Sequence, residues 1–390
     1  MNILFVSALL PYPLHSGGQV RMYNLLKALS KKHDITLMSF IRNEEERALA
    51  THISFVKDVH MIMRGKGRQA KYIFKALGNF PLLLATYDNR MMQQKIKEEL
   101  ARKKYDLVHI EPFYVFPSLP PLSVPMIVSE HNVEYAIYLK NAEKIRFPLL
   151  KPLAYFDAVK IKIWEEIVWQ RARIVTAVSE DDAKIISAST KKETPVIPNG
   201  VDTKTFTYVG KKFDKKNPTF LFVGNFLWAP NLEAVRQLLT TIWLKILLVY
   251  PEAKLTIVGK HFPSGLRKYI LPSVHLEEYV EDIRDAFAAS DVLLAPMGIG
   301  GGTKFKILEA MATGTLVVTT KEGRMGIVGT SGKEFYEAAT PEEFGSAVNT
   351  IYAHPETAKT ITKNARKMVE TMYDWQAIAE KLDVVWKGAV

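Results

Sequence analysis

Cysteine is absent from the 390-residue chain, which excludes disulfides, thiolate metal sites and a thiol nucleophile. Long apolar runs are missing as well. The run Ile242 to Tyr250 is interrupted by Lys245 and is shorter than the ~18 residues that a membrane-spanning helix needs. The N-terminal apolar run lacks a basic flank and breaks at Pro11 and Pro13, which predicts a first strand and not a signal peptide. We therefore expect a cytoplasmic protein whose membrane contacts are peripheral.

Several nucleotide and catalytic motifs are also missing. There is no G-x-G-x-x-G in the first strand-helix unit, no G-x-x-x-x-G-K-[ST] and no G-x-S-x-G. These absences argue against a dinucleotide oxidoreductase, a P-loop ATPase and an α/β-hydrolase. No D-x-D occurs either, so we expect neither a metal ion nor a cofactor. A bound diphosphate would then be neutralised by backbone dipoles and by Lys or Arg.

The charge is strongly positive, with a formal value of +11, and much of the excess lies between Lys57 and Lys104. In that region Arg and Lys alternate with Ile, Phe, Tyr and Leu. Two interpretations remain open: a solvated basic face, or a surface for anionic lipid or a polyanionic substrate. No helix-turn-helix, zinc-finger or RNP pattern accompanies the charge, so nucleic acid is not the expected partner.

Short apolar runs alternate with helix-sized segments in both halves of the chain. In the first half these runs are NILFVSAL, HDITLMSF, DLVHIEP, PMIVSEHN and RIVTAVS, and in the second half TFLFVGN, KLTIVGK, VHLEEYV, DVLLAPM and TLVVTT. Such spacing predicts parallel sheets with helical crossovers. Between the halves, PVIPNGVD and a Lys-rich stretch predict an interdomain connection. We expect an α/β protein with one domain at 1–195, a second at 196–373, and a C-terminal helix at 374–390 that packs back on the first.

The strongest local signal follows the DVLLAPM run, where a glycine loop precedes a predicted helix. Its predicted phosphate-binding residues are Gly300, Gly301, Gly302, Thr303, Lys304 and Lys306. Glycines permit close backbone approach, and a helix N-terminus offers N–H groups with a partial positive charge. Glu309 follows on the same helix face and can accept hydrogen bonds from a ribose diol. Gly314 is expected to end the helix. The alternative is that the glycines only form a tight turn.

Two features of the first half are weaker candidates. Gly17 and Gly18 follow the first strand and precede an amphipathic helix whose predicted inward residues are Val20, Tyr23, Leu26, Ala28 and Leu29. Their backbone N–H groups are expected to meet donor phosphates across a cleft between the two domains, although a simple turn is an equal alternative. His131 ends the PMIVSEHN strand, where parallel sheets bind ligands, although a single histidine is often structural.

Helix signals at two other places support the same organisation. Thr340 is followed by proline and two acidic residues, and Ser179 precedes Asp182 by three positions. Both patterns predict N-caps.

Five segments, in order, resemble the family 4 glycosyltransferases of the GT-B fold. They are LPYPLHSGGQVRMYNLLKAL, VTAVSEDDAK with VIPNGVDTKTF, FVGNFLWAPNLEAV, LLAPMGIGGGTKFKILEAMATGTLVVTT and DWQAIAEKL. The resemblance covers nearly the whole chain. It implies two Rossmann-like doubly wound parallel-sheet domains facing across a cleft, a nucleotide-sugar donor, retention of anomeric configuration and no required metal.

The resemblance also implies roles for single residues. Glu309 falls on the family glutamate that holds the ribose hydroxyls, and His131 on the histidine that contacts the transferred sugar. The loop from Val280 to Ile283 matches the one whose backbone meets the nucleobase. Two positions depart from the family pattern: glycine stands at Gly301 in place of a glutamate, and Asn225 in place of an arginine.

A lysine after the glycines is expected to replace the missing cation. Lys304 is the predicted choice over Lys306, because it lies nearer the helix N-terminus.

The expected function is therefore a retaining, metal-independent hexosyltransferase that uses a UDP- or GDP-sugar. The expected acceptor is a glycan or a lipid-linked molecule of cell-surface polysaccharide or lipopolysaccharide synthesis, reached at the inner face of the cytoplasmic membrane. Two alternatives stay open: a GT-B nucleotide-sugar epimerase or hydrolase, and a non-catalytic binding partner.

Overall fold

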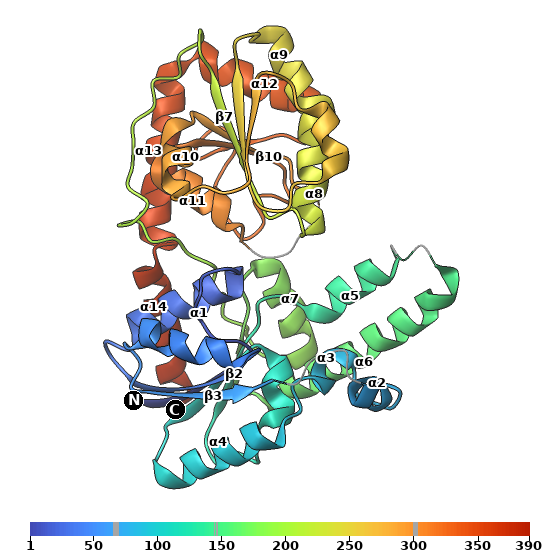
Figure 1. The fold of residues 1–390 in the computed structure, drawn as a ribbon. Helices are drawn as coiled ribbons and strands as arrows, with labels where there is room; N and C mark the ends of the chain where they lie inside the picture. The colour runs from blue at the N-terminus through green and yellow to red at the C-terminus, as the bar shows by residue number, and fades with distance from the viewer. Residues whose placement is uncertain (65–69, 144, 146, 299–302) are drawn as a thin grey trace. The chain divides into compact units, whose positions relative to one another are not determined.

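The computed structural model describes residues 1–64, 70–143, 145, 147–298 and 303–390. It divides into two compact units, the first comprising Met1–Pro198 with Ile378–Val390 and the second comprising Asn199–Ala377. Each unit holds a six-stranded parallel sheet, as the alternation of apolar runs predicted (Figure 1).

Unit 1 has the strand order β3-β2-β1-β4-β5-β6. Its strands are β1 (Asn2–Ser7), β2 (Asp34–Ile41), β3 (Asp58–Met63), β4 (Leu107–Glu111), β5 (Met126–Ser129) and β6 (Ile174–Thr176). The sequence prediction missed β3, which is a half-exposed strand at the edge of the sheet. The central strands are almost completely buried because helices cover both faces of the sheet, which explains their nearly continuous apolar sequences.

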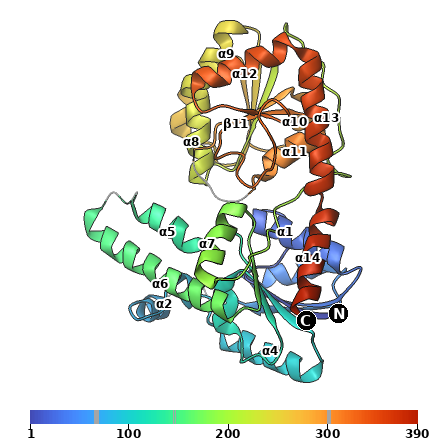
Figure 2. The same cartoon turned by 180° about the vertical axis from the view of Figure 1, so that it is seen from behind.

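The helices of unit 1 vary widely in length. They are α1 (Gly17–Leu29), α2 (Ala70–Ala76), α3 (Leu82–Ala85), α4 (Arg90–Arg102), α5 (Glu134–Glu143), α6 (Lys151–Arg171) and α7 (Glu180–Thr190), with 3-10 turns η1 (Glu44–Ile53), η2 (Phe113–Ser118) and η3 (Pro148–Leu150). The N-cap predicted at Ser179 is confirmed, since its side chain accepts a hydrogen bond from the Asp182 amide at 3.2 Å. Helices α5 and α6 form a hairpin that extends from the body of the unit (Figures 1 and 2).

The inward face predicted for α1 was only partly right. Leu26 and Leu29 are buried, but Val20 and Tyr23 are half-exposed, and Arg21 is buried instead. The physical reason is that the helix turns toward polar groups at the carboxyl ends of the strands, and these groups accept hydrogen bonds from a buried guanidinium.

Unit 2 has the strand order β12-β11-β10-β7-β8-β9. Its strands are β7 (Thr219–Val223), β8 (Lys254–Val258), β9 (Val274–Glu277), β10 (Val292–Ala295), β11 (Leu316–Thr319) and the short β12 (Tyr336–Glu337). The helices are α8 (Ala229–Gln237), α9 (Trp243–Val249), α10 (Ile283–Ala289), α11 (Phe305–Thr313), α12 (Pro341–Ala353) and α13 (Pro355–Met372), with a π turn η4 (Leu238–Ile242) and a 3-10 turn η5 (Ser264–Tyr269). The order in which strands are added to the sheet reverses between β7 and β10, which lie side by side and parallel, and ligands of doubly wound sheets bind at such a switch point.

Two helix ends predicted in unit 2 are confirmed. Gly314 ends α11 with φ +81°, a left-handed conformation that glycine adopts without strain. A Cβ there would lie 2.7 Å from the carbonyl oxygen of Val209. Thr340 caps α12 by accepting a hydrogen bond from the Glu343 amide at 3.2 Å.

The last helix, α14 (Trp375–Ala389), brings the C-terminal residues into unit 1. The indole of Trp386 is fully buried there, and its Nε1 donates to Nδ1 of His109 at 3.0 Å. Within the described residues, no helix has the length and apolar character required to cross a membrane.

Candidate functional site

The start of α11 is the candidate phosphate site of unit 2. It follows β10 at the carboxyl edge of the sheet, and Lys304 occupies its N-cap position in an extended conformation. A lysine side chain has no acceptor, so it cannot satisfy the amide groups of the first helical turn. These amides and the helix dipole favour an anion at this end. The predicted residues Gly300, Gly301 and Gly302 lie outside the described residues.

Lys306 is held on the inner side of this helix start. Its Nζ donates to Oδ1 of Asn231 at 2.8 Å and lies 4.8 Å from the centre of the Phe222 ring. Burial, together with the charge of Lys304, lowers the pKa of Lys306 to about 7. An anionic ligand beside it would favour the protonated form, so ligand binding and proton uptake at Lys306 are coupled.

Glu309 lies one turn further along α11. Burial raises the pKa of its carboxyl group to about 7, and the charge of Lys306 only partly opposes this rise. A carboxyl group in such surroundings is stabilised by hydrogen-bond donors, which a vicinal diol supplies.

Asn231 was missed by the sequence prediction. It is buried, and it connects Lys306 to the loop after β7 because its Nδ2 donates to the carbonyl of Asn225 at 3.0 Å. The side chain of Asn225 accepts from the amide of Leu227 at 3.0 Å and so fixes its own loop. Gly224 gives Asn231 its room, since a Cβ there would lie 2.8 Å from the Asn231 side chain. No motif marked Asn231, because a single asparagine in a helix has no distinctive signal.

The other predicted residues of unit 2 lie at the same edge of the sheet. Thr303 is buried, and its carbonyl accepts from Nδ2 of Asn199 at 3.2 Å. Val280 lies in the loop between β9 and α10, and Ile283 is the first residue of α10. The carboxyl ends of β7, β9 and β10 therefore all contribute predicted residues.

In unit 1 the structure brings Gly18 and His131 together. A Cβ on Gly18 would lie 2.9 Å from Cε1 of His131, so only glycine fits without displacing the ring. Gly17 is the first residue of α1, and Ser16 caps the helix. Both His131 and the start of α1 lie at the carboxyl edge of the sheet, which is where a doubly wound domain binds ligands.

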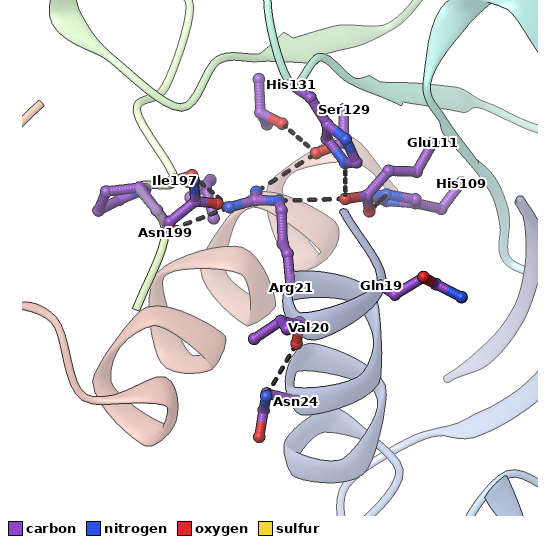
Figure 3. A network of polar contacts seen from close by, with 12 residues as sticks. Gln19, Val20, Arg21, Asn24, His109, Glu111, Ser129, His131, Ile197 and Asn199 are labelled. Carbon is purple, nitrogen blue, oxygen red and sulfur yellow. Dashed lines mark hydrogen bonds and ion pairs between the residues drawn. The ribbon is translucent and has the colours of Figure 1, made fainter. Parts of the chain in front are cut away.

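A buried ion network holds His131, and the sequence prediction missed its other members (Figure 3). Oε1 of Glu111 accepts from Nε2 of His131 at 2.6 Å and from Nε of Arg21 at 3.1 Å. Arg21 also donates to the carbonyls of Ile197 and Pro198, at 2.8 and 2.9 Å. Burial alone would raise the pKa of Glu111, but the histidine hydrogen bonds and the charges of His131 and Arg21 hold it far below its usual value.

The network also fixes tautomers. Because Trp386 can only donate, Nδ1 of His109 accepts its hydrogen bond, and Nε2 of His109 carries the proton that points to Glu111 at 3.3 Å. Likewise Glu111 is an acceptor, so Nε2 of His131 carries a proton. Nδ1 of His131 is left on the side of Gly18, 3.1 Å from where a Cβ would stand.

Comparison with known proteins decides the family. Residues 15–205 match the model of Glycosyltransferase Family 4, and residues 217–354 match that of Glycosyl transferases group 1. The chain is a glycosyltransferase of this family 4/group 1 type, with the GT-B fold. The chain is 24% identical over 393 residues to an uncharacterized 44.6 kDa protein in the cps region of Klebsiella pneumoniae, covering 96% of each chain. It is 22% identical to an MMP alpha-(1->4)-mannosyltransferase of Mycolicibacterium hassiacum, covering 69% of this chain and 66% of the relative.

Solved structures share the fold of this glycosyltransferase. Anabaena HepE, solved with UDP and glucose, matches with a TM-score of 0.67 at 16% identity and covers 100% of both chains. WaaG, a glycosyltransferase involved in lipopolysaccharide biosynthesis, matches with a TM-score of 0.64 at 15% identity, covering 99% of this chain and 100% of WaaG.

Proposed function

We propose that this glycosyltransferase transfers a sugar from a UDP- or GDP-sugar to a glycan or lipid-linked acceptor, with retention of configuration and without a metal ion. The observation that carries the proposal is the start of α11, where Lys304, Lys306 and the helix N-terminus gather at the switch point of the sheet of unit 2. Such a site stabilises the charge of a departing nucleoside diphosphate.

The proposed reaction breaks the bond between the anomeric carbon and the phosphate oxygen. The acceptor hydroxyl forms the new glycosidic bond on the same face of the sugar, and its proton passes to the departing diphosphate. Lys304 and the 300–302 loop neutralise that diphosphate, and Glu309 binds the ribose hydroxyls. The backbone at Val280 and Ile283 meets the base, and the loop of Asn225 lies beside the phosphates.

In unit 1 we propose that His131 contacts the transferred sugar and that Gly17 and Gly18 offer backbone amides to the donor. Glu111 supports this role of His131 because it orients the ring through Nε2. Because this hydrogen bond fixes the tautomer, one ring nitrogen of His131 is a donor and the other is an acceptor. A histidine without such a partner has no fixed assignment of the two.

The proposed setting is the synthesis of cell-surface polysaccharide or lipopolysaccharide at the inner face of the cytoplasmic membrane. Two of the similar proteins support this setting: the relative in a cps region and WaaG, which is involved in lipopolysaccharide biosynthesis. No cofactor other than the donor is part of the proposal.

The test is a panel of UDP- and GDP-sugars assayed first by thermal shift and then, for each stabilising donor, by product analysis with and without candidate acceptors. The proposal is supported if UDP or GDP is released only when an acceptor is present. The anomeric configuration of the new glycosidic bond should then be the same as that of the sugar in the donor. Conversion of donor alone to free sugar or an epimer would instead indicate a nucleotide-sugar epimerase or hydrolase. Absence of stabilisation by any nucleotide would indicate a non-catalytic binding partner.

A further inference from the structure

Helix α6 presents an apolar face to solvent. The inner side of α6 carries Ala158, Ile161 and Val168, which are fully buried. Away from these residues, Leu153 is 64% exposed and Phe156 is 55% exposed. A surface helix of a globular protein normally carries polar residues on that side. The outer side of α6 is therefore apolar where a helix that meets only water would be polar.

Helix α2 lies beside α6 and extends this apolar surface. Nζ of Lys160 donates to the carbonyls of Ala76 and Phe80 at 2.6 and 3.1 Å, and Nε1 of Trp164 donates to the carbonyl of Asn79 at 3.1 Å. These bonds fix the segment after α2 against α6 (Figures 1 and 2). We use the name α2–α6 face for nine exposed apolar residues of both helices, of the position directly after α2 and of the turn before α6: Ile73, Phe74, Leu77, Leu149, Leu153, Phe156, Val159, Ile163 and Ile167.

The apolar surface continues into a cavity beside the C-terminal half of α6. The cavity measures about 890 Å³ and is lined by Ile167 and Trp164 on the α6 side and by Leu119 and Leu122 on the other. Its charged lining residues are Arg171, Arg173 and Lys192, with one acid, Asp88. A cavity of this size, apolar within and cationic at one border, accepts a chain with an anionic head.

The charges around the α2–α6 face are mainly positive. Helix α2 contains Lys71 and Lys75 and no acidic residue, and Lys75 is paired with Asp88. The acids of α6 are either buried, as Glu165 is, or paired with its own lysines, as Asp157 is with Lys160 and Glu166 with Lys162. Lys71, Lys151 and Arg171 are in no ion pair with the described residues. A soluble protein partner of this chemistry would have to be both apolar and acidic, whereas an anionic phospholipid bilayer combines the two properties by construction. Charge complementarity therefore favours the bilayer.

We propose that the α2–α6 face docks unit 1 onto an anionic phospholipid bilayer. The apolar residues enter the boundary between headgroups and acyl chains, and the lysines and arginines contact lipid phosphates. This docking surface deepens the proposed function and rests on it, since we propose there that the acceptor is reached at a membrane. The docking surface also replaces the whole Lys57–Lys104 region as the membrane contact by the two helices α2 and α6. Several basic residues of that region are paired with acids, among them Lys57 with Asp34 at 2.7 Å and Arg102 with Glu99 at 2.6 Å.

The test compares vesicle binding of the full chain with that of the double variant Leu153→Ser, Phe156→Ser. The matched control is Leu248→Ser, which changes a still more exposed leucine, 79% against 64% for Leu153, on α9 of unit 2. Binding is measured by co-flotation with vesicles of phosphatidylcholine alone and of equimolar phosphatidylcholine and phosphatidylglycerol. Calorimetric titration with UDP and GDP on the same variants reports the donor site separately, so failure of docking and failure of the proposed function are distinguished.

We expect the wild type and Leu248→Ser to float with the anionic vesicles and to bind more weakly as salt rises. The double variant should bind these vesicles at least tenfold more weakly, given the transfer free energy of the lost apolar groups. Equal binding by all three proteins, or no binding by the wild type, would overturn the proposal. A wild-type dimer in the absence of vesicles that the double variant abolishes would also overturn it, in favour of a second copy on this face.

The absence of cysteine permits a second, local measurement. A single cysteine placed at Phe156 and labelled with an environment-sensitive dye should shift to the blue with anionic vesicles, and a water-soluble quencher should no longer reach it. The same label at Leu248 should keep its spectrum and its quenching. Identical responses at the two positions would contradict the docking surface.

Discussion

Replacing Glu111 by glutamine tests the buried network that holds His131. The substitution keeps the size of the side chain but removes the charge that faces Arg21, whose side chain is 1% exposed. Breaking a buried ion pair by removing one partner costs about 3 to 5 kcal/mol, because the other charge stays buried without compensation. Arg21 keeps its two backbone carbonyl acceptors, so we expect a loss near the lower limit, about 3 kcal/mol.

A double-mutant cycle with Arg21→Met separates the pair from its surroundings. Arg21→Met alone should also cost about 3 kcal/mol, while the double variant leaves neither charge uncompensated. The double variant should therefore lose roughly 2 kcal/mol less than the sum of the single losses.

Urea denaturation followed by hydrogen exchange in peptides from β1, β4 and β5 measures unit 1 separately from unit 2. Strict additivity of the two single losses would refute the network.

The same carboxylate predicts an acid sensitivity. The pKa of Glu111 in the folded protein lies below its ordinary value, so the unfolded chain binds the proton more readily. Its contribution to stability is complete above about pH 5 and is lost as the pH falls toward its folded pKa. The wild type should thus lose more stability than Glu111→Gln between neutral pH and pH 3.

Three further substitutions test the individual sites. Lys304→Ala should lower turnover more than about a hundredfold with an unchanged melting temperature. The control Lys363→Ala, which removes an exposed lysine of α13, should leave turnover unchanged. Similar turnover in the two variants would show that Lys304 is not part of the site. Gly18→Ala should lower turnover at least about tenfold, because the added Cβ displaces the ring of His131. The change in unfolding free energy should stay below ~1 kcal/mol, because alanine has the higher helix propensity. Normal turnover would show that the position of the ring is unimportant. Glu309→Gln should stabilise unit 2 by roughly 1 to 3 kcal/mol at pH 8 and by less at pH 5, because a carboxyl group with a raised pKa is costly to ionise in the folded state. Urea denaturation at the two pH values measures the difference. Equal effects at both would contradict the raised pKa.

Local patterns in the sequence were sufficient to predict most of the fold. Alternating apolar runs predicted ten of the strands because buried parallel strands have nearly continuous apolar sequences. Gly314 and Thr340 were recognisable because helix ends impose specific local chemistry. Strand β3 was missed because its partly exposed residues, DVHMIM, lack that continuous pattern.

The candidate site was less predictable, because its supporting residues meet only through the tertiary fold. Arg21 and Glu111 are 90 positions apart in the sequence, and Arg21 was not among the residues predicted to face inward. Asn231 similarly meets Lys306 across 75 positions. Burial of a charged residue depends on its partner, and no local pattern in the sequence identifies that partner.

The central claim is that the start of α11 binds the diphosphate of a nucleotide-sugar. The most direct test is calorimetric titration of UDP and GDP into the wild type, Lys304→Ala and Lys363→Ala. We predict that at least one nucleotide binds the wild type and Lys363→Ala with equal affinity and binds Lys304→Ala at least about tenfold more weakly. Failure of both nucleotides to bind the wild type, or undiminished binding to Lys304→Ala, would contradict the claim.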